Sequence, residues 1–119
     1  MEWTALKSAD QVGWLREESN HKPVLIFKYS SRCSTSRVVL DRLERNWNPE
    51  RAGQLKSYFL DLITYRSVSD MISSLFDVVH ESPQVLVIKN GNLIYAQSHF
   101  GIAFDHIIEA INRGKNADV

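Results

Sequence analysis

The sequence has 119 residues and 14 basic against 14 acidic side chains, so we expect no nucleic-acid partner and no membrane partner, and we leave the oligomeric state open. Its length is below the about 150 residues of an average domain, which predicts a single domain over residues 1–119. Cys33 is the only cysteine, which excludes an internal disulfide, a CxxC dithiol, and a metal or iron–sulfur site built from several cysteines of one chain.

The first predicted elements are a helix and a buried strand. Ser8 is a suitable N-cap for a helix over residues 9–18. Val12 and Leu15 in that segment have the i, i+3 spacing of a buried helix face. The apolar run Val24–Phe27 is unbroken, which is typical of a strand buried on both faces of its sheet.

The middle of the chain predicts a second helix, a loop and a second strand. The helix begins near Cys33–Ser36 and runs to about Trp47, because apolar residues recur at helical spacing through this stretch. The polar segment Asn46–Gln54 predicts a loop. A second strand is predicted around Tyr58–Leu60, followed by Leu62.

The last part of the chain predicts a helix, a hairpin and a closing helix. The first of these helices is predicted from an apolar stripe at helical spacing, formed by Val68, Met71, Ile72, Leu75, Phe76 and Val79. Pro83 ends that region, and residues 85–88 are a third apolar strand. The Asn-Gly pair within residues 89–92 favours a tight turn into a fourth strand over 93–96. Apolar residues at helical spacing over 104–111 predict the closing helix.

The predicted element order is α-β-α-β-α-β-β-α. Strand–helix–strand units favour parallel pairing with a right-handed crossover, and the late turn favours an antiparallel pair. The simplest architecture is an α/β fold with a four-stranded mixed β-sheet flanked by helices, the layout of thioredoxin-like proteins. Unrelated activities share such a fold, so function has to be argued from the site.

Cys33 follows the first predicted strand and begins a helix, and the carboxyl ends of strands are where α/β sheets bind ligands. Unpaired N–H groups and the helix dipole at this position favour a thiolate. Lys28, Arg32 and Arg37 add positive charge nearby in the sequence. Ser36 stands where the second cysteine of a CxxC pair would be, and it can donate a hydrogen bond to the sulfur. The alternative is a buried, inert thiol that packs as a small apolar residue.

The segment around Pro83 is the second informative feature. The residues alone favour an ordinary trans peptide bond before this proline. Two segments, Ile26–Ser36 and His80–Gly91, together with Ser98-His99, resemble the YtxJ-type monothiol bacilliredoxin family. The resemblance covers nearly the whole chain. A CxxS segment alone is a weak signal, but its combination with a later His-Glu-Ser-Pro-Gln segment is specific.

That resemblance implies a thioredoxin-like fold in which the peptide bond before Pro83 is cis and the proline packs beside the reactive sulfur. It also implies an activity, the removal of bacillithiol (a low-molecular-weight thiol) from protein cysteines. Many members of the family have proline directly after the cysteine, where this chain has Ser34, and they also differ from it at Tyr29.

We therefore expect a monothiol thiol–disulfide oxidoreductase that removes bacillithiol from protein mixed disulfides. The residues expected to carry the chemistry are Cys33, Ser36 and Arg32, and those expected to bind substrate are Ser82, Pro83, Ser31, Ser34 and Thr35. We expect no bound cofactor, with bacillithiol or another low-molecular-weight thiol as co-substrate and thiol-modified proteins as partners. The alternative is a non-catalytic protein-binding module of thioredoxin fold, in which Cys33 is incidental.

Other features bear on metal binding and on the compartment. No pair of the four histidines has HxH or HxxxH spacing, so we expect no metal site. Asp61 lies in an apolar strand, where it either caps a turn or lies beneath the active site. No apolar run approaches the about 20 residues that span a membrane, and the N-terminus lacks the pattern of an export signal. We therefore expect the reducing cytoplasm as the compartment of this free thiol.

Overall fold

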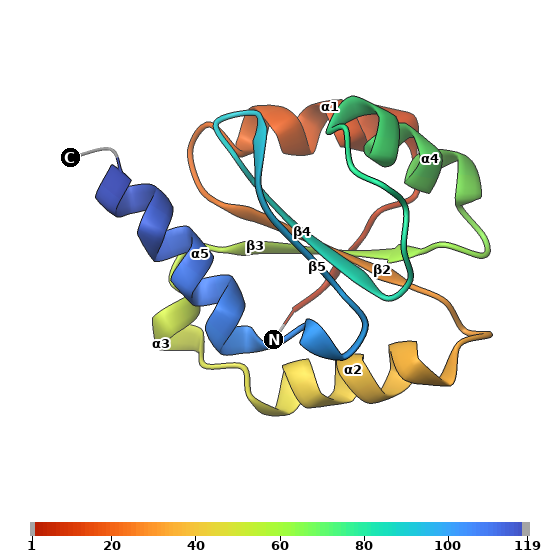
Figure 1. Ribbon diagram of the computed structural model, residues 1–119. Coiled ribbons are helices and arrows are strands. Elements are labelled where there is room, and N and C mark those ends of the chain that lie inside the picture. The colour runs from red at the N-terminus through yellow and green to blue at the C-terminus, as the bar shows by residue number, and fades with distance from the viewer. Residues whose placement is uncertain (1, 118–119) are drawn as a thin grey trace.

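Five strands form one mixed sheet in the computed structural model, which describes residues 2–117 (Figure 1). The strands are β1 (Thr4–Ala5), β2 (Val24–Tyr29), β3 (Lys56–Asp61), β4 (Gln84–Lys89) and β5 (Asn92–Ser98). Their order across the sheet is β1-β3-β2-β4-β5. β3 pairs in parallel with β1 and β2, whereas β4 is antiparallel to both β2 and β5.

The edge strand β1 is missing from the four-stranded prediction, which is therefore wrong by one strand. Thr4 and Ala5 pair with Tyr58 and Phe59 of β3. The N–H of Leu6 then donates to the Phe59 carbonyl at 2.9 Å. A strand of two residues shows no alternating pattern, so the sequence carries no signal for it. The other four strands and their mixed pairing are confirmed.

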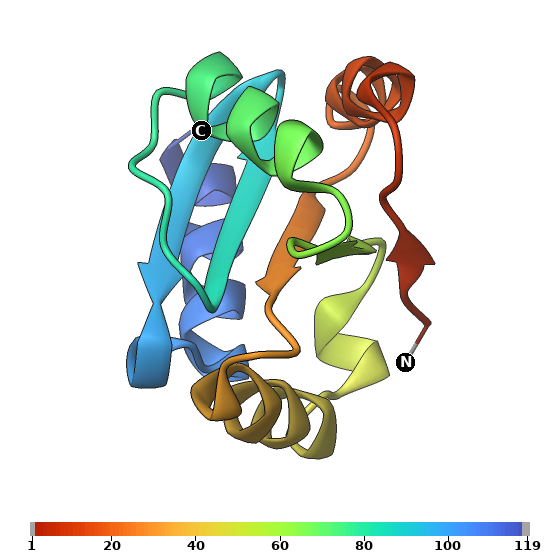
Figure 2. The same cartoon turned by 90° about the vertical axis from the view of Figure 1, so that its right-hand side faces the viewer.

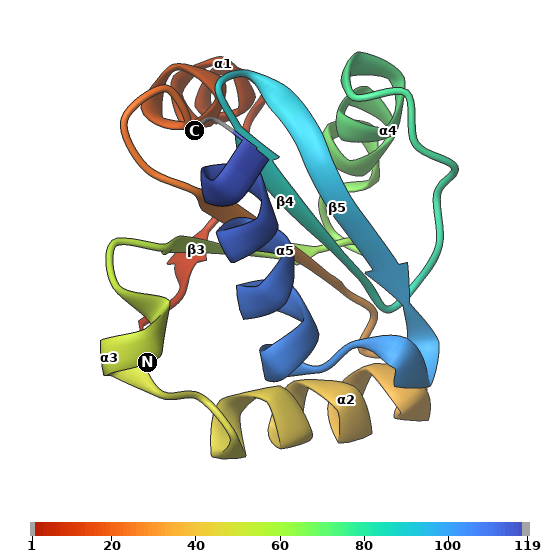
Figure 3. The same cartoon turned by 60° about the vertical axis from the view of Figure 1, so that its left-hand side comes forward.

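Helices cover both faces of the sheet (Figures 1 and 2). On one face lie α1 (Ala9–Glu18) and α4 (Arg66–Leu75). On the other lie α2 (Ser34–Arg45), α3 (Pro49–Ala52), the 3₁₀ helix η1 (His99–Gly101) and α5 (Phe104–Ala117). Figure 3 shows α5 in front of the sheet, with α2 crossing below it. Within residues 2–117, no helix is both long enough and apolar enough to cross a membrane.

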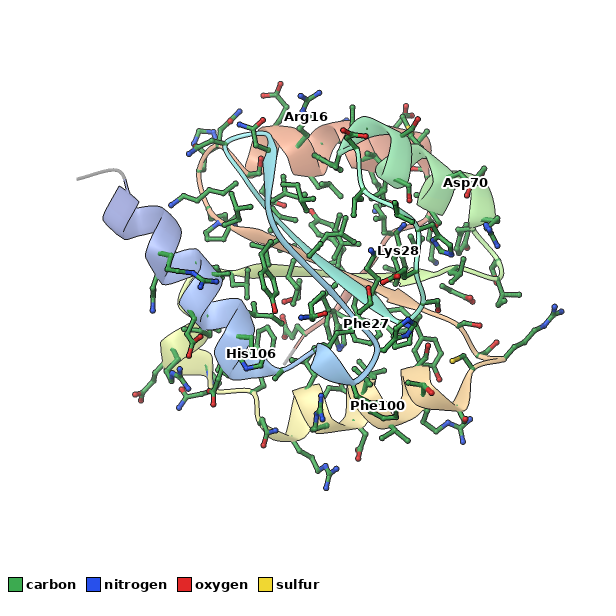
Figure 4. All side chains as sticks on the ribbon, viewed as in Figure 1. Arg16, Phe27, Lys28, Asp70, Phe100 and His106 are labelled. Carbon is green, nitrogen blue, oxygen red and sulfur yellow. The ribbon has the colours of Figure 1, made fainter. Side chains whose placement is uncertain are left out.

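Each face of the sheet has its own apolar core, and β2 contributes to both because successive side chains of a strand point to opposite faces. Val24 and Ile26 pack in the core beneath α1 and α4, whereas Leu25 and Phe27 pack against α2 and α5. All four are fully buried, and each such side chain contributes about 1.5–3 kcal/mol to folding. The same alternation directs the next residue, Lys28, to the α4 side (Figure 4).

Local contacts and backbone conformation explain where α1 begins and where α4 ends. The Ser8 hydroxyl accepts from the Gln11 N–H at 3.4 Å, and the Gln11 side chain accepts from the Ser8 N–H at 3.2 Å. This capping box starts α1 where the sequence predicts it. By contrast, α4 ends at Leu75, because Asp77 adopts a left-handed φ of 51° that a helix cannot continue. Val79, predicted on the buried face, is 81% exposed.

The segment after α2 also differs from its prediction. α2 ends at Arg45 and not near Trp47, and the expected loop contains the short helix α3. The Asn48 side chain caps α3, since its Oδ1 accepts from the N–H groups of Glu50 and Arg51 at 3.0 and 3.2 Å.

Candidate functional site

Cys33 is the N-cap residue of α2, in the turn that follows β2. Its N–H donates to the Ser30 carbonyl at 3.1 Å, and its own carbonyl accepts from the Ser36 N–H at 3.1 Å. The side chain is half-buried. The sulfur is therefore accessible to solvent while the surrounding backbone is held, at the strand–helix junction that the sequence predicts.

Hydrogen-bond donors in the first turn of α2 lower the pKa of the Cys33 thiol below its ordinary value. The backbone N–H of Ser36 has the largest effect. The N–H of Thr35 and the hydroxyls of both residues act in the same direction, and partial burial of the sulfur opposes them. The local geometry thus favours the thiolate, which is the nucleophilic form of cysteine.

Ser36 supports this arrangement from a fully buried position. Its Oγ accepts from the Ser30 N–H at 3.3 Å, which leaves the hydroxyl proton free to be donated to the Cys33 sulfur. The Ser30 hydroxyl in turn accepts from the Arg32 N–H at 3.3 Å. These contacts fix the turn between β2 and α2 that carries the thiol.

The structure separates the basic residues that lie near Cys33 in sequence. Arg32 and Arg37 are exposed, and a role for the Arg32 charge stays a prediction. Lys28 is fully buried and its Nζ bonds to α4 on the opposite side of β2 from Phe27 (Figure 4). Its ammonium is not among the groups that lower the pKa of Cys33, contrary to the expectation from sequence proximity.

The hydroxyl residues predicted to bind substrate lie along the same turn and helix start. Ser31 and Ser34 are exposed, and Thr35 is half-buried. Their placement leaves them accessible beside Cys33, and their contact with a substrate stays a prediction.

The second predicted segment, around Pro83, lies at the end of the sheet where β2 leads into α2. The peptide bond between Ser82 and Pro83 is cis, the isomer that the family resemblance implies and not the one that the residues alone favour. Pro83 is buried and Ser82 half-buried, directly before β4. Because Gln84 of β4 pairs with Lys28 of β2 in antiparallel register, Pro83 lies beside the end of β2. The start of β4 and the start of α2 are at the same end of the molecule (Figure 2).

The 3₁₀ helix η1 lies at the same end of the sheet and contacts both the Pro83 segment and α2. The His99 N–H donates to the Pro83 carbonyl at 3.0 Å. Arg42 of α2 donates through Nη2 to the Phe100 carbonyl at 2.8 Å and also to the Ile102 carbonyl. The Phe100 side chain is 61% exposed (Figure 4). Backbone and guanidinium contacts thus join α2, η1 and the start of β4.

The sequence alone does not predict one group of residues near this end of the sheet. We call it the Lys28 cluster, and it consists of Lys28, Ser69, Ser73, His80 and Gln84. Lys28 Nζ lies 2.9 Å from Ser73 Oγ and 3.4 Å from His80 Nδ1. Strand alternation was the available signal, because it places an isolated lysine on a buried face, where lysine is rare.

Asp61 caps the turn after β3. Its Oδ1 accepts from the N–H groups of Ile63 and Thr64 at 3.2 and 3.4 Å, and its Oδ2 accepts from the Thr64 hydroxyl at 2.9 Å. Of the two alternatives, turn capping is the one that the structure supports. In the part of the chain that the structure describes, no group of three or more His, Cys, Asp or Glu side chains could hold a metal ion.

Comparison with known proteins shows the family and the fold of the chain. The family model described as monothiol bacilliredoxin BrxC matches residues 4–107, a span that includes both Cys33 and Pro83. A solved structure of a candidate oxidoreductase with a thioredoxin fold is 30% identical to this chain and superposes with a TM-score of 0.76. That match covers 89% of this chain and 90% of the other.

Thioredoxins have the same architecture at much lower identity. The thioredoxin of Malassezia sympodialis is 14% identical, with a TM-score of 0.73 over 93% of this chain and 90% of its own. The thioredoxin of Trypanosoma brucei brucei is 9% identical, with a TM-score of 0.74 over 97% of this chain and 92% of its own. These similarities show the fold alone. The predicted thioredoxin-like fold is confirmed, with five strands in place of four.

Proposed function

The chain belongs to the monothiol bacilliredoxin BrxC family, and we propose that it removes bacillithiol from protein mixed disulfides by thiol–disulfide exchange at Cys33. The observation that carries this proposal is the state of the thiol, whose pKa is lowered, chiefly by the Ser36 N–H, at the start of α2. A lower pKa raises the thiolate fraction at neutral pH, and the thiolate is the attacking species. Because Cys33 is the only cysteine, the cycle uses one protein thiol.

The first step of the proposed cycle transfers bacillithiol to this protein. The Cys33 thiolate attacks the bacillithiol sulfur of the mixed disulfide, and the bond between that sulfur and the substrate cysteine breaks. The substrate cysteine leaves as a thiolate and takes a proton from solvent. Cys33 is now disulfide-bonded to bacillithiol, so the oxidation equivalent has moved from the substrate to this protein.

The second step restores Cys33. A thiolate from the low-molecular-weight thiol pool attacks the bacillithiol sulfur, and the Cys33 thiolate leaves. The product is a disulfide between bacillithiol and the attacking thiol. No bound cofactor is needed, and a compartment with a reduced thiol pool, the cytoplasm, supplies the co-substrate.

The neighbouring residues have distinct roles in this proposal. Ser36 and Thr35 stabilise the sulfur anion, both as it attacks and as it leaves, through the donors that lower its pKa. Arg32 is exposed directly before Cys33, and its positive charge favours the thiolate. The segment before β4, with Ser82 and Pro83, offers backbone groups to an extended substrate chain. Ser31 and Ser34 border the same turn.

Intact mass spectrometry tests the proposal. The reduced protein is mixed with a peptide that carries bacillithiol on its single cysteine. We expect one bacillithiol adduct on the wild type, with release of one equivalent of reduced peptide, and removal of the adduct when free bacillithiol is added. The Cys33→Ser variant, which differs by one atom, should form no adduct and release no peptide.

A wild type that forms no adduct contradicts the proposal. The competing interpretation is a protein-binding module with an incidental cysteine. It predicts that no adduct forms, that the Cys33 pKa is at or above the free value of about 8.5, and that alkylation at neutral pH is slow.

A further inference from the structure

Lys28 is fully buried, and its contacts satisfy every proton that an ammonium carries. Its Nζ lies 3.3 Å from the Ser69 carbonyl, 2.9 Å from Ser73 Oγ and 3.4 Å from His80 Nδ1. An ammonium has three N–H donors and no acceptor, so these three acceptors can take all of them. No carboxylate is among these contacts.

The charge of Lys28 is costly where it lies. Burial lowers its pKa to about 8, while Asp70 raises the pKa and Arg66 lowers it. Those two residues are exposed and pair with each other at 3.2 Å on α4. Lys28 is therefore still protonated at neutral pH, and its hydrogen bonds, together with the charge of Asp70, partly offset the desolvation of its own charge. An apolar side chain of similar length would fill this space without that cost, which points to a role for the donors.

The donors act on the chain that leads to Pro83. Residues 76–83, between α4 and β4, have no helix or strand. Backbone hydrogen bonds hold the two ends of this segment, to α4 and to His99, and side-chain contacts hold residues 79 and 80 in between. Gln84, the cross-strand neighbour of Lys28, donates through Nε2 to the Val79 carbonyl at 3.0 Å. Lys28 holds the next residue, His80. Two buried side chains from adjacent strands thus hold two consecutive residues of this segment.

The state of His80 fits the contact with Lys28. Burial has the largest effect in lowering the pKa of His80, and the charge of Lys28 acts in the same direction. The imidazole is therefore neutral at pH 7. Because the ammonium can only donate, Nδ1 accepts its proton and the ring N–H is on Nε2. The same Nδ1 lies 3.4 Å from the Ser69 hydroxyl.

We propose that Lys28 is a positioning residue for exchange with protein substrates: through His80 its ammonium fixes the segment Val79–Pro83, so that the Ser82 backbone can pair with an extended substrate chain beside Cys33. This inference rests on the proposed function and gives it a substrate preference. A small disulfide has no chain to pair with the segment. Lys28 therefore contributes to reaction with protein and peptide mixed disulfides and not to reaction with small disulfides.

A comparison of large and small substrates tests the inference. Lys28→Met keeps the length of the side chain and removes its three donors, and Lys7→Met removes an exposed lysine as the matched control. For Lys28→Met we expect the second-order rate with a bacillithiol–peptide mixed disulfide to fall at least about tenfold, the effect of losing a hydrogen bond to a charged group. Its rates with oxidised bacillithiol and with iodoacetamide should stay within about twofold of the wild type, because the donors around Cys33 are unchanged.

Variants of His80 provide a rescue and an independent route if Lys28→Met does not fold. His80→Asn keeps an acceptor close to the position of Nδ1, whereas His80→Leu removes it. We expect His80→Asn to retain most of the rate with the peptide substrate and His80→Leu to lose as much as Lys28→Met. The double variant Lys28→Met/His80→Leu should be no slower than either single variant, because both remove the same contact.

Equal losses with the peptide, with oxidised bacillithiol and with iodoacetamide overturn the inference, since they indicate a general disturbance of the site. An unchanged rate with the peptide also overturns it. If the wild type reacts with no mixed disulfide at all, the proposed function fails, and amide hydrogen exchange then decides the positioning role by itself. Faster exchange of Val79–Ser82 in Lys28→Met, but not in Lys7→Met, supports it, and unchanged exchange overturns it.

Discussion

The buried hydroxyl of Ser36 accepts a hydrogen bond from the backbone N–H of Ser30 at 3.3 Å. This contact joins the two ends of the turn that carries Cys33. Ser36 therefore has two functions, as an acceptor that holds the turn and as a donor that lowers the pKa of the thiol. A change at this position is expected to affect both the reactivity of the sulfur and the stability of the fold.

Replacing Ser36 with alanine should raise the pKa of Cys33 only in part. The hydroxyl donor is lost, but the N–H of the same residue, which has the largest effect on that pKa, remains. The free energy of unfolding should also fall by about 1–3 kcal/mol, because the Ser30 N–H is left buried without a partner. The pH dependence of iodoacetamide alkylation gives the pKa, and urea unfolding gives the stability. Ser34→Ala, at an exposed position, is the control and should change neither. A Ser36→Ala profile identical to the wild type would show that the hydroxyl does not act on the sulfur.

Replacing Ser36 with cysteine should convert the protein to a dithiol enzyme. Positions 33 and 36 are one turn apart at the start of α2 and face each other. The introduced thiol should attack the bacillithiol adduct on Cys33, release free bacillithiol and leave an internal disulfide. Intact mass should show an adduct-free protein lighter by two hydrogen atoms, with no second thiol added. A stable adduct on Ser36→Cys would contradict this expectation.

The stability of the wild type relative to Lys28→Met should depend on pH above neutrality. Burial lowers the pKa of Lys28 from 10.5 to about 8, so between these values the unfolded chain binds more protons than the folded one. Raising the pH through this window therefore stabilises the wild type relative to the variant, by at most about 3 kcal/mol. At pH 7 the lysine is mostly protonated in both states, so the difference should change little near that pH. Urea unfolding of both proteins from pH 7 to 10 measures it, and a difference that stays flat or decreases with pH would refute the assignment.

The pKa of His80 should rise in Lys28→Met. The positive charge of Lys28 is one of the groups that lower it, and the substitution removes that charge. Burial, the largest effect, remains, so the pKa should stay below the ordinary value for histidine. The imidazole NMR signals followed from pH 4 to 8 report this directly, with Lys7→Met as the control. If the pKa of His80 is the same in both variants, the ammonium is not close to the ring.

The sequence predicts the centre of this fold better than its edges. The two central strands are buried on both faces over residues 24–27 and 85–88. A strand buried in this way needs apolar residues at every position, and the sequence shows them as unbroken apolar runs. β1 has two residues and pairs only through its backbone with β3, which leaves no pattern to detect. The apolar stripe continues past Asp77, but the left-handed backbone conformation of that residue ends α4 at Leu75, so the stripe overestimates the length of the helix.

The same contrast applies to the site. The position of Cys33 follows from local order, a strand followed directly by a helix, and local order can be read from a sequence. The place of Lys28 depends on which face of β2 it occupies and on what α4 and His80 offer there. Proximity in sequence suggested that its charge acts on the thiol, but strand alternation directs it to the other side of the sheet. Contacts between segments far apart in the chain are what the sequence alone could not supply.

The presence of a single cysteine also determines how the protein responds to its surroundings. A dithiol that closes into an internal disulfide consumes one small disulfide and releases two small thiols, so its equilibrium shifts when the whole thiol pool is diluted. Cys33 consumes one small disulfide and releases one small thiol, so the equilibrium constant of its reaction has no units of concentration. Its fractional modification therefore follows the ratio of disulfide to thiol and is independent of the size of the pool, which makes the two kinds of protein respond to different properties of the same solution.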